Sequence, residues 1–182
     1  MTWRNTTDRY GTLSVWMHWL MVLLLAAVYL CITLRTNFPR GSTERTALMN
    51  WHFMLGISVL VLVGLRMLAR LTGPTPLITP APAWWLGLMG RVMHLSLYVF
   101  MIGMPLLGWL MRSAQGRAIP FFGLQLPPLI GRNEELGDLI KLLHVTGGEI
   151  GYYLIGLHAA GGLFHHSFLK DNTLGRMLPV PK

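Results

Sequence analysis

Histidine is the residue type in this chain best placed to do chemistry, because all seven histidines lie in or at the ends of long apolar stretches. They are His18, His52, His94, His144, His158, His165 and His166. An imidazole inside an apolar membrane environment is costly and by default marks a functional site, although any single one can instead be a core residue that bonds a backbone carbonyl. Pairs of facing imidazoles are one way in which proteins hold haem iron.

The spacing of four histidines predicts two such pairs. His144 and His158 are fourteen residues apart, which is four helical turns less about 40°, so they share a face about 21 Å apart along the axis. His52 lies about six residues inside the end of the second apolar stretch that is remote from the termini, here called the outer end. His18 lies about five residues inside the inner end of the first. The depths match, and we expect an outer site of His52 with His144 and an inner site of His18 with His158.

Other metal and redox chemistries fit these residues less well. A zinc or copper transporter would place carboxylates or thiols beside its histidines, but the apolar stretches hold only Glu149 and Cys31, on different predicted helices. A thiol oxidase needs cysteine pairs. Because Cys31 is the only cysteine, an intrachain disulfide and a CxxCH haem-attachment motif are also excluded.

The elements that must position the histidines are predicted to be membrane helices. Of 182 residues, 53% are hydrophobic and 12% charged, and the mean hydropathy of +0.49 excludes a water-soluble enzyme. The net charge of +8 lies between apolar runs and forms no nucleic-acid-binding motif. The fold class expected is all-α: an integral membrane four-helix bundle, a single domain over 1–182, with helices at about 13–34, 46–68, 88–111 and 140–168.

A proline-rich linker is expected between the second and third helices, from Leu71 to Gly90, with Trp84 and Trp85 at the membrane interface. The first helix is too long for a signal peptide and is expected to remain attached. Eight basic residues lie on the side of the termini and seven on the other. Because several of the eight crowd a short loop, we expect both termini in the cytoplasm and the longest loop, 112–141, outside.

Glycines and cations near the histidines are consistent with bound haem. Small residues leave room for a porphyrin edge, although they equally serve helix packing; they are Gly56, Gly147, Gly148, Gly151, Ala159, Ala160, Gly161 and Gly162. Haem propionates need cations, and Arg66, Arg70 and Arg112 are candidates, with snorkelling at the interface as the alternative.

Short motifs along nearly the whole chain resemble the bacterial cytochrome b561 family. They are Met17–Trp19 (MHW), Phe38–Arg40 (FPR), Met49–His52 (MNWH), Gly56–Ser58 (GIS) and Gly151–Pro179, in which LHAA, HH and KDNT follow at fixed spacing. The last segment is the most specific.

The resemblance implies a multi-pass di-haem b-type cytochrome of the bacterial inner membrane. Its implied haem ligands are His18, His52, His144 and His158, in agreement with the pairs reached from spacing. The members most similar to this chain take electrons from superoxide outside, pass them through two non-covalent haems b and reduce ubiquinone. His165 matches a position associated with the quinone.

The residues themselves support a donor and an acceptor surface. The outer side carries seven basic residues against four acidic ones, and we expect some of Arg40, Arg45, Arg112 and Arg117 to steer an anion to the outer haem; an ordinary solvated loop or contact with anionic lipid is the alternative.

At the inner end, His165 or His166 beside Phe164 and Phe168 suits a quinone, or else a plain interface anchor. His94 lacks a depth-matched partner and is interpreted as a packing or supporting residue. Glu149 would tune the outer haem, shuttle a proton or only face a loop.

Two further functions remain open at this stage. One is a quinol-oxidising cytochrome b that donates electrons to a periplasmic redox partner. The other is a membrane anchor subunit that binds haem only structurally. Superoxide, a quinone and the lipid bilayer are the expected partners, and nucleic acid is not.

Overall fold

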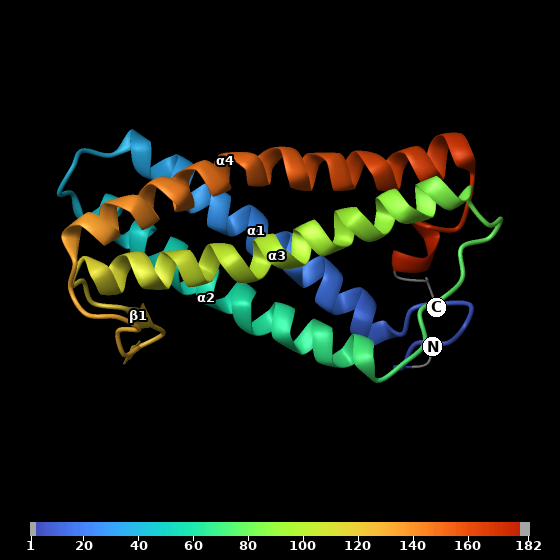
Figure 1. The fold of residues 1–182 in the computed structure, drawn as a ribbon, viewed down its shortest axis with the longest axis horizontal. Helices are drawn as coiled ribbons and strands as arrows, with labels where there is room; N and C mark the ends of the chain where they lie inside the picture. Colours follow the sequence, from blue (N-terminus) through green and yellow to red (C-terminus); the bar gives the residue numbers. More distant parts are fainter. Residues whose placement is uncertain (1–2, 179–182) are drawn as a thin grey trace.

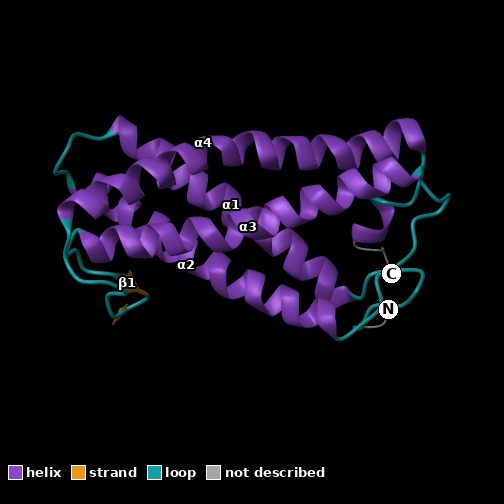
Figure 2. Cartoon of the chain, in the orientation of Figure 1, coloured by secondary structure: helices purple, strands orange, loops and turns teal. Residues whose placement is uncertain are grey.

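The computed structural model describes residues 3–178, and four long helices dominate it (Figures 1 and 2). The helices are α1 (Thr12–Leu34), α2 (Thr43–Leu71), α3 (Trp84–Ala114) and α4 (Glu134–Phe164). Short elements join or end them: the 3₁₀ turn η1 (Arg35–Asn37), strands β1 (Pro120–Phe121) and β2 (Leu124–Gln125), the π-helical turn η2 (His165–Leu169) and the 3₁₀ turn η3 (Gly175–Met177).

Helix α1 packs on α2, α2 on α3 and α3 on α4. Aliphatic and methionine side chains fill the space between the helices, and the buried members of this core are Met21, Val59, Leu62, Val63, Leu97 and Met101. Many other large apolar side chains point outward and are exposed. An apolar exterior is what a bundle needs when lipid, not water, surrounds it.

Three of the helices have the length and composition to cross a membrane: α1 with its following turn (Thr12–Asn37), α2 and α3. Helix α4 is 31 residues long and runs beside α3 (Figure 1). Glycines, two tyrosines and Glu149 replace aliphatic residues in its middle, so the expected fourth span does not qualify by composition. Its placement within the bundle is nevertheless that of a fourth member.

The helices begin earlier than the apolar runs. The Ser42 side chain accepts a hydrogen bond from the Arg45 N–H at the start of α2, and Asn133 accepts one from Leu136 at the start of α4. These N-caps stabilise polar first turns that apolar periodicity does not detect. Helix α3 likewise begins at Trp84, directly after the proline-rich segment, so Trp84 and Trp85 belong to the helix and not to the expected linker.

The outer loop contains a small hairpin, which the all-α expectation missed. The outer loop itself spans residues 115–133 between α3 and α4, so it is shorter than the expected 112–141. Strands β1 and β2 pair antiparallel, and the turn residues Phe122 and Gly123 both have positive φ, as a two-residue hairpin turn requires. Ile119 anchors the hairpin by packing on Phe53 and Ile57 of α2.

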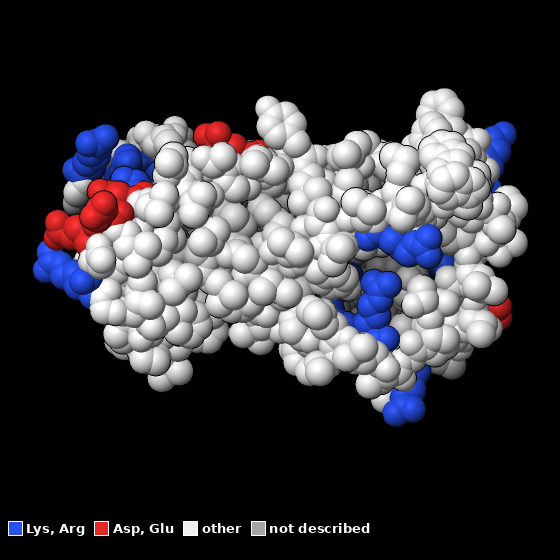
Figure 3. Space-filling view, viewed as in Figure 1, with Lys and Arg blue, Asp and Glu red and all other residues white. Residues whose placement is uncertain are grey.

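The first and last described segments lie at the same end of the bundle, opposite the hairpin (Figure 1). On the face that Figure 3 shows, lysine and arginine side chains gather at the left end and around a hollow in the right half, and few charged side chains lie between them. This distribution fits a membrane-embedded middle between two aqueous ends.

Candidate functional site

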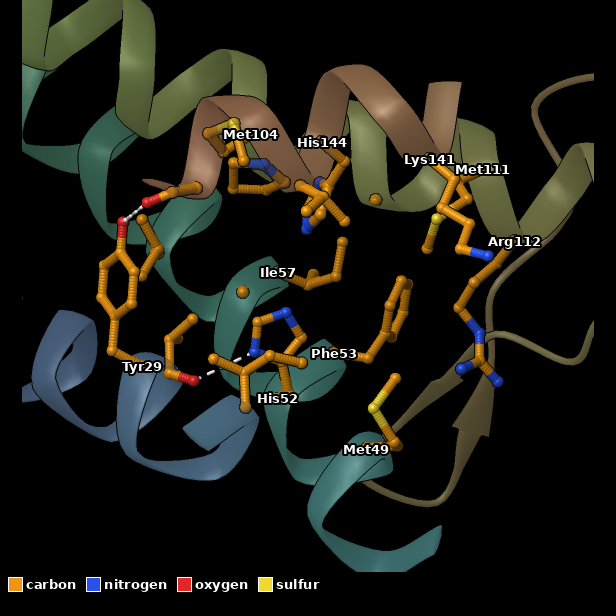
Figure 4. A pocket seen from close by; sticks show the side chains of 18 of the residues that line it. Tyr29, Met49, His52, Phe53, Ile57, Met104, Met111, Arg112, Lys141 and His144 are labelled. Carbon is orange, nitrogen blue, oxygen red and sulfur yellow. Dashed lines mark hydrogen bonds between the residues drawn. The ribbon is translucent and has the colours of Figure 1, made fainter. Parts of the chain in front are cut away.

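His52 on α2 and His144 on α4 face each other at the outer end of the bundle. Their ring centroids are 6.2 Å apart and the ring planes are inclined at 84°. The Nδ1–H of His52 donates to the Val28 carbonyl on α1 at 3.0 Å, which leaves Nε2 free to bind a metal (Figure 4). Nδ1 of His144 is buried and makes no hydrogen bond of good geometry within the described residues. The outer pair expected from spacing is therefore brought together.

The separation of these rings suits one metal ion between them. A metal–imidazole bond is about 2.0–2.1 Å, so two trans imidazoles place their centroids about 6.4 Å apart. Among residues 3–178, no group of three or more His, Cys, Asp or Glu side chains could hold a metal ion. Two imidazoles are an incomplete ligand set for a bare ion, but they suffice for haem, whose porphyrin supplies the other four nitrogens.

A cavity of about 460 Å³ surrounds the outer pair. It is of the size of ligand sites in proteins, and side chains from all four helices line it (Figure 4). Its walls are mostly apolar, with Phe53, Ile57 and Met104 among them. Four cations also line it: Arg35, Arg112, Arg117 and Lys141. An apolar slot with cations is the environment that a dicarboxylate macrocycle requires.

Glycines near the outer pair play different roles. Gly56 and Gly148 line the cavity, as the porphyrin interpretation of these residues requires. Gly108 lies against the His144 ring, since a Cβ there would stand 3.3 Å from Cε1; sequence reasoning did not single it out. Gly151 instead lets α4 approach the Tyr29 hydroxyl and the Phe100 ring, which is a helix-packing role.

The inner pair is also brought together. The rings of His18 on α1 and His158 on α4 have centroids 6.3 Å apart and an interplanar angle of 70°. An Arg66 guanidinium nitrogen lies 3.4 Å from Nδ1 of His18, so one of the three candidate propionate cations is beside this pair. Of the other two candidate cations, Arg112 lines the outer cavity, whereas the charge of Arg70 acts on His94, which neighbours the inner pair.

His94 has a partner that the depth argument missed. Its ring centroid lies 5.5 Å from that of His158. This is shorter than the span of two imidazoles across one metal ion, about 6.4 Å, so His18 suits His158 better as a trans ligand. The position of His94 remains consistent with a supporting role.

At the inner end, His165 pairs with Asp171. The His165 Nδ1–H donates to Asp171 Oδ2 at 2.6 Å, and Oδ1 of the same carboxylate accepts from the Thr173 N–H at 2.8 Å. Burial acts to raise the pKa of the Asp171 carboxyl, but the hydrogen bonds from His165 and Thr173 outweigh it and hold that pKa below its usual range. His166 is exposed, and the sequence did not predict a role for Asp171.

Comparisons with known proteins agree with this architecture. The sequence model of the prokaryotic cytochrome b561 family matches residues 9–180. Cytochrome b561 homolog 1 of Escherichia coli (strain K12) is 36% identical over 175 residues, which cover 96% of this chain and 99% of that protein. The probable superoxide oxidase CybB of Yersinia pestis is 36% identical over 171 residues, which cover 94% of this chain and 96% of that protein. Cytochrome b561 homolog 2 of Escherichia coli (strain K12) is 28% identical over an alignment of 183 residues, which covers 98% of this chain and 95% of that protein.

Proposed function

The chain belongs to the prokaryotic cytochrome b561 family, whose members are membrane-integral b-type haem proteins, and we propose that it is a di-haem superoxide:ubiquinone oxidoreductase. It oxidises superoxide at the periplasmic face of the bacterial inner membrane and passes electrons inward to ubiquinone, with both termini in the cytoplasm. The similarity to the probable superoxide oxidase of Yersinia pestis supports the choice of donor.

The observation that carries the proposal is the outer cavity. It combines two facing imidazoles, an apolar interior and four cations, Arg35, Arg112, Arg117 and Lys141. Superoxide is an anion, and cations around an outward-facing site raise the rate at which an anion arrives by roughly 10–10³. A site that only anchored haem would not need cations beyond those that pair with its propionates.

The residues around the two proposed haem sites have distinct roles. His52 and His144 hold the outer haem iron, and the Val28 carbonyl orients His52 through Nδ1. His18 and His158 would hold the inner haem iron, and an Arg66 guanidinium nitrogen, which can only donate, lies 3.4 Å from Nδ1 of His18. The haems supply one-electron redox chemistry at a potential that the protein tunes. Gly108 leaves the His144 ring its space.

The cations divide between binding and shaping the outer site. The Arg112 guanidinium lies 5.0 Å above the Phe53 ring and donates from Nε to the Ala118 carbonyl at 2.8 Å, so part of its hydrogen-bonding capacity holds the outer loop. Arg117 lines the cavity without such a hydrogen bond in the described residues. We therefore assign Arg117 to anion steering and Arg112 to the shape of the entrance.

The acceptor site lies at the inner end, where His165 adjoins the exposed rings of Phe164 and Phe168. These two rings stack with centroids 5.3 Å apart. Exposed aromatic side chains offer a quinone ring an apolar contact open to lipid, and His165 offers it a polar hydrogen. Two superoxide ions, one quinone and two protons give two molecules of dioxygen and one quinol, so each turnover delivers two electrons singly.

The direct test is the absorption spectrum of the purified oxidised protein on exposure to enzymatically generated superoxide. We expect reduced b-haem bands that superoxide dismutase abolishes and ubiquinone discharges. Bands that respond to quinol but not to superoxide would instead favour electron flow outward to a periplasmic partner. Haem that responds to neither would indicate an anchor subunit.

A further inference from the structure

His165 and Asp171 form a hydrogen-bonded pair just after the end of α4, and haem binding does not explain this pair. The π-helical turn η2 begins at His165, and Lys170 follows it with a positive φ of 53°, which reverses the chain. This reversal brings Asp171 next to the His165 ring. The Asp171 side chain is only 2% exposed, and the His165 side chain is 18% exposed. The carboxylate is hidden behind the imidazole, and the imidazole keeps an accessible edge.

We propose that Asp171 is the positioning residue of quinone reduction: it fixes the proton of His165 on Nδ1, presents Nε2 to the quinone carbonyl and stabilises the imidazolium that delivers a proton there. This role rests on the proposed function, because it needs a quinone at His165.

The hydrogen bonds support one protonation pattern. A carboxylate only accepts, so the 2.6 Å contact requires the proton on Nδ1 of His165. The remaining ring nitrogen, Nε2, is then the atom available to a ligand. Thr173 holds the carboxylate in place with its N–H at 2.8 Å, and its hydroxyl lies 3.5 Å from the same Nδ1.

The segment that carries Asp171 is itself anchored. The Asn172 N–H donates to the Thr79 carbonyl at 3.1 Å, and the Thr79 N–H donates to Oδ1 of Asn172 at 2.9 Å. Farther on, the indole N–H of Trp19 donates to the Met177 carbonyl at 2.7 Å. Trp19 follows His18 in the sequence and its ring lies 5.6 Å from the His18 ring. The segment that follows Asp171 is therefore tied both to Thr79 and to the helix that carries His18.

Other charged groups near the pair do not replace Asp171. Lys170 and His166 are exposed, and the Arg176 side chain donates to the Pro76 carbonyl and lies 5.7 Å from the Tyr10 ring centroid. Within the described residues, the charged partner that acts on Asp171 is His165. His165 and Asp171 are therefore the charged members of this unit, and Thr173 is their neutral hydrogen-bond partner.

The chemical step is the transfer of a proton from His165 to the quinone. For each electron that the quinone receives from the proposed oxidation of superoxide, the Nε2–H bond of the imidazolium breaks and an O–H bond forms on the quinone carbonyl oxygen that faces it. The neutral imidazole, still bonded to Asp171, is then reprotonated from water at the inner surface. The second carbonyl oxygen, on the opposite side of the quinone ring, takes its proton from water at the inner surface. An amide at position 171 still accepts from Nδ1–H but cannot stabilise the imidazolium.

The experiment compares wild-type protein, Asp171→Asn and the control Asp8→Asn, which removes an exposed carboxylate in the first described segment, at the same end of the molecule. Each haem-loaded protein is reduced, mixed with a short-chain ubiquinone, and followed by stopped-flow absorption between pH 5.5 and 9. For Asp171→Asn we expect unchanged haem spectra, reoxidation slowed about 10-fold or more at neutral pH, and a dependence of the rate on pH that differs from that of the wild type. Asp8→Asn should match the wild type.

Two results would overturn the inference: equal rates in Asp171→Asn and wild type, or slowing by the same factor at every pH. If wild-type protein itself is not reoxidised by quinone, the proposed function fails, and that outcome is distinct because it does not involve the variant. Thr173→Val provides a second variant that keeps the carboxylate; it should slow reoxidation less than Asp171→Asn and leave the pH profile in place.

Discussion

Gly108 on α3 faces the His144 ring on α4, because a Cβ at position 108 would stand 3.3 Å from Cε1 of that ring. No side chain larger than hydrogen fits there without moving the imidazole. The orientation of one proposed haem ligand is therefore set by a glycine on a different helix.

The first prediction concerns this contact. Gly108→Ala should turn the His144 ring and weaken outer haem binding about 10-fold or more, as changes beside metal ligands do, with a shift in part of the b-haem spectrum. Haem titration of apoprotein measures it. Gly103→Ala, on the same helix with open space around the added Cβ, should bind haem as the wild type does, and an equal effect in both variants would contradict the prediction.

The second prediction tests the ligand pairs. His52→Ala or His144→Ala should halve the haem content and stop reduction by superoxide, because the outer haem loses one axial bond while the inner pair is untouched. The pyridine haemochrome assay per mole of protein gives the content. His166→Ala, at an exposed position, serves as the control and should retain both haems. A His144→Ala protein with full haem content would refute the outer assignment.

The third prediction concerns anion steering. Arg117→Glu should slow reduction by superoxide about 10-fold at low ionic strength, and the difference from wild type should shrink as salt is added, because screening weakens long-range attraction. Arg132→Glu is the matched control at the same end, since Arg132 is paired with Glu134 and does not line the outer cavity. Identical salt dependence in all three proteins would rule out a role for Arg117.

The fourth prediction is structural. Gly151→Ala places a methyl group into the Tyr29 hydroxyl and the Phe100 ring, so α4 must move away from α1 and α3. Overpacking of this kind costs about 1–3 kcal/mol, and thermal unfolding in a lipid-like detergent should show it as a lower midpoint. Gly156→Ala adds a methyl group that meets nothing within 4 Å and should leave the midpoint unchanged.

The fifth prediction follows from the lowered pKa of Asp171. Because its carboxyl is more acidic in the folded protein than in the unfolded chain, the unfolded state takes up the proton first as pH falls. Asp171 therefore stabilises the fold above the ordinary carboxyl pKa, about 3.9, and that contribution disappears as pH drops through the lower folded value. Between pH 6 and pH 3, the measured free energy of unfolding should fall less steeply for Asp171→Asn than for the wild type.

Helical periodicity and ring depth were enough to predict the bundle and the facing pairs, because His144 and His158 lie on one continuous helix whose geometry is regular. Depth matching found no partner for His94, although its ring centroid lies 5.5 Å from that of His158. Helix α3 also begins at Trp84, about one turn before the expected start at about 88.

Features that depend on chain reversal were not predictable. The His165–Asp171 contact requires the π-helical turn and the positive φ of Lys170, and neither has a signal in apolar periodicity. The hairpin at 120–125 is likewise fixed by Ile119 packing on α2, a contact between segments far apart in the sequence.

The fourteen-residue spacing of His144 and His158 along α4 also determines how the reaction responds to voltage. The two proposed haem sites are separated by about 21 Å along the helix, roughly two thirds of a hydrocarbon core of about 30 Å. An electron that moves inward travels toward the negative side of an energised membrane, at a cost of about 1.5 kcal/mol for every 100 mV. In the proposed orientation, collapse of a 100 mV membrane potential should therefore shift electrons toward the inner site by about 10-fold.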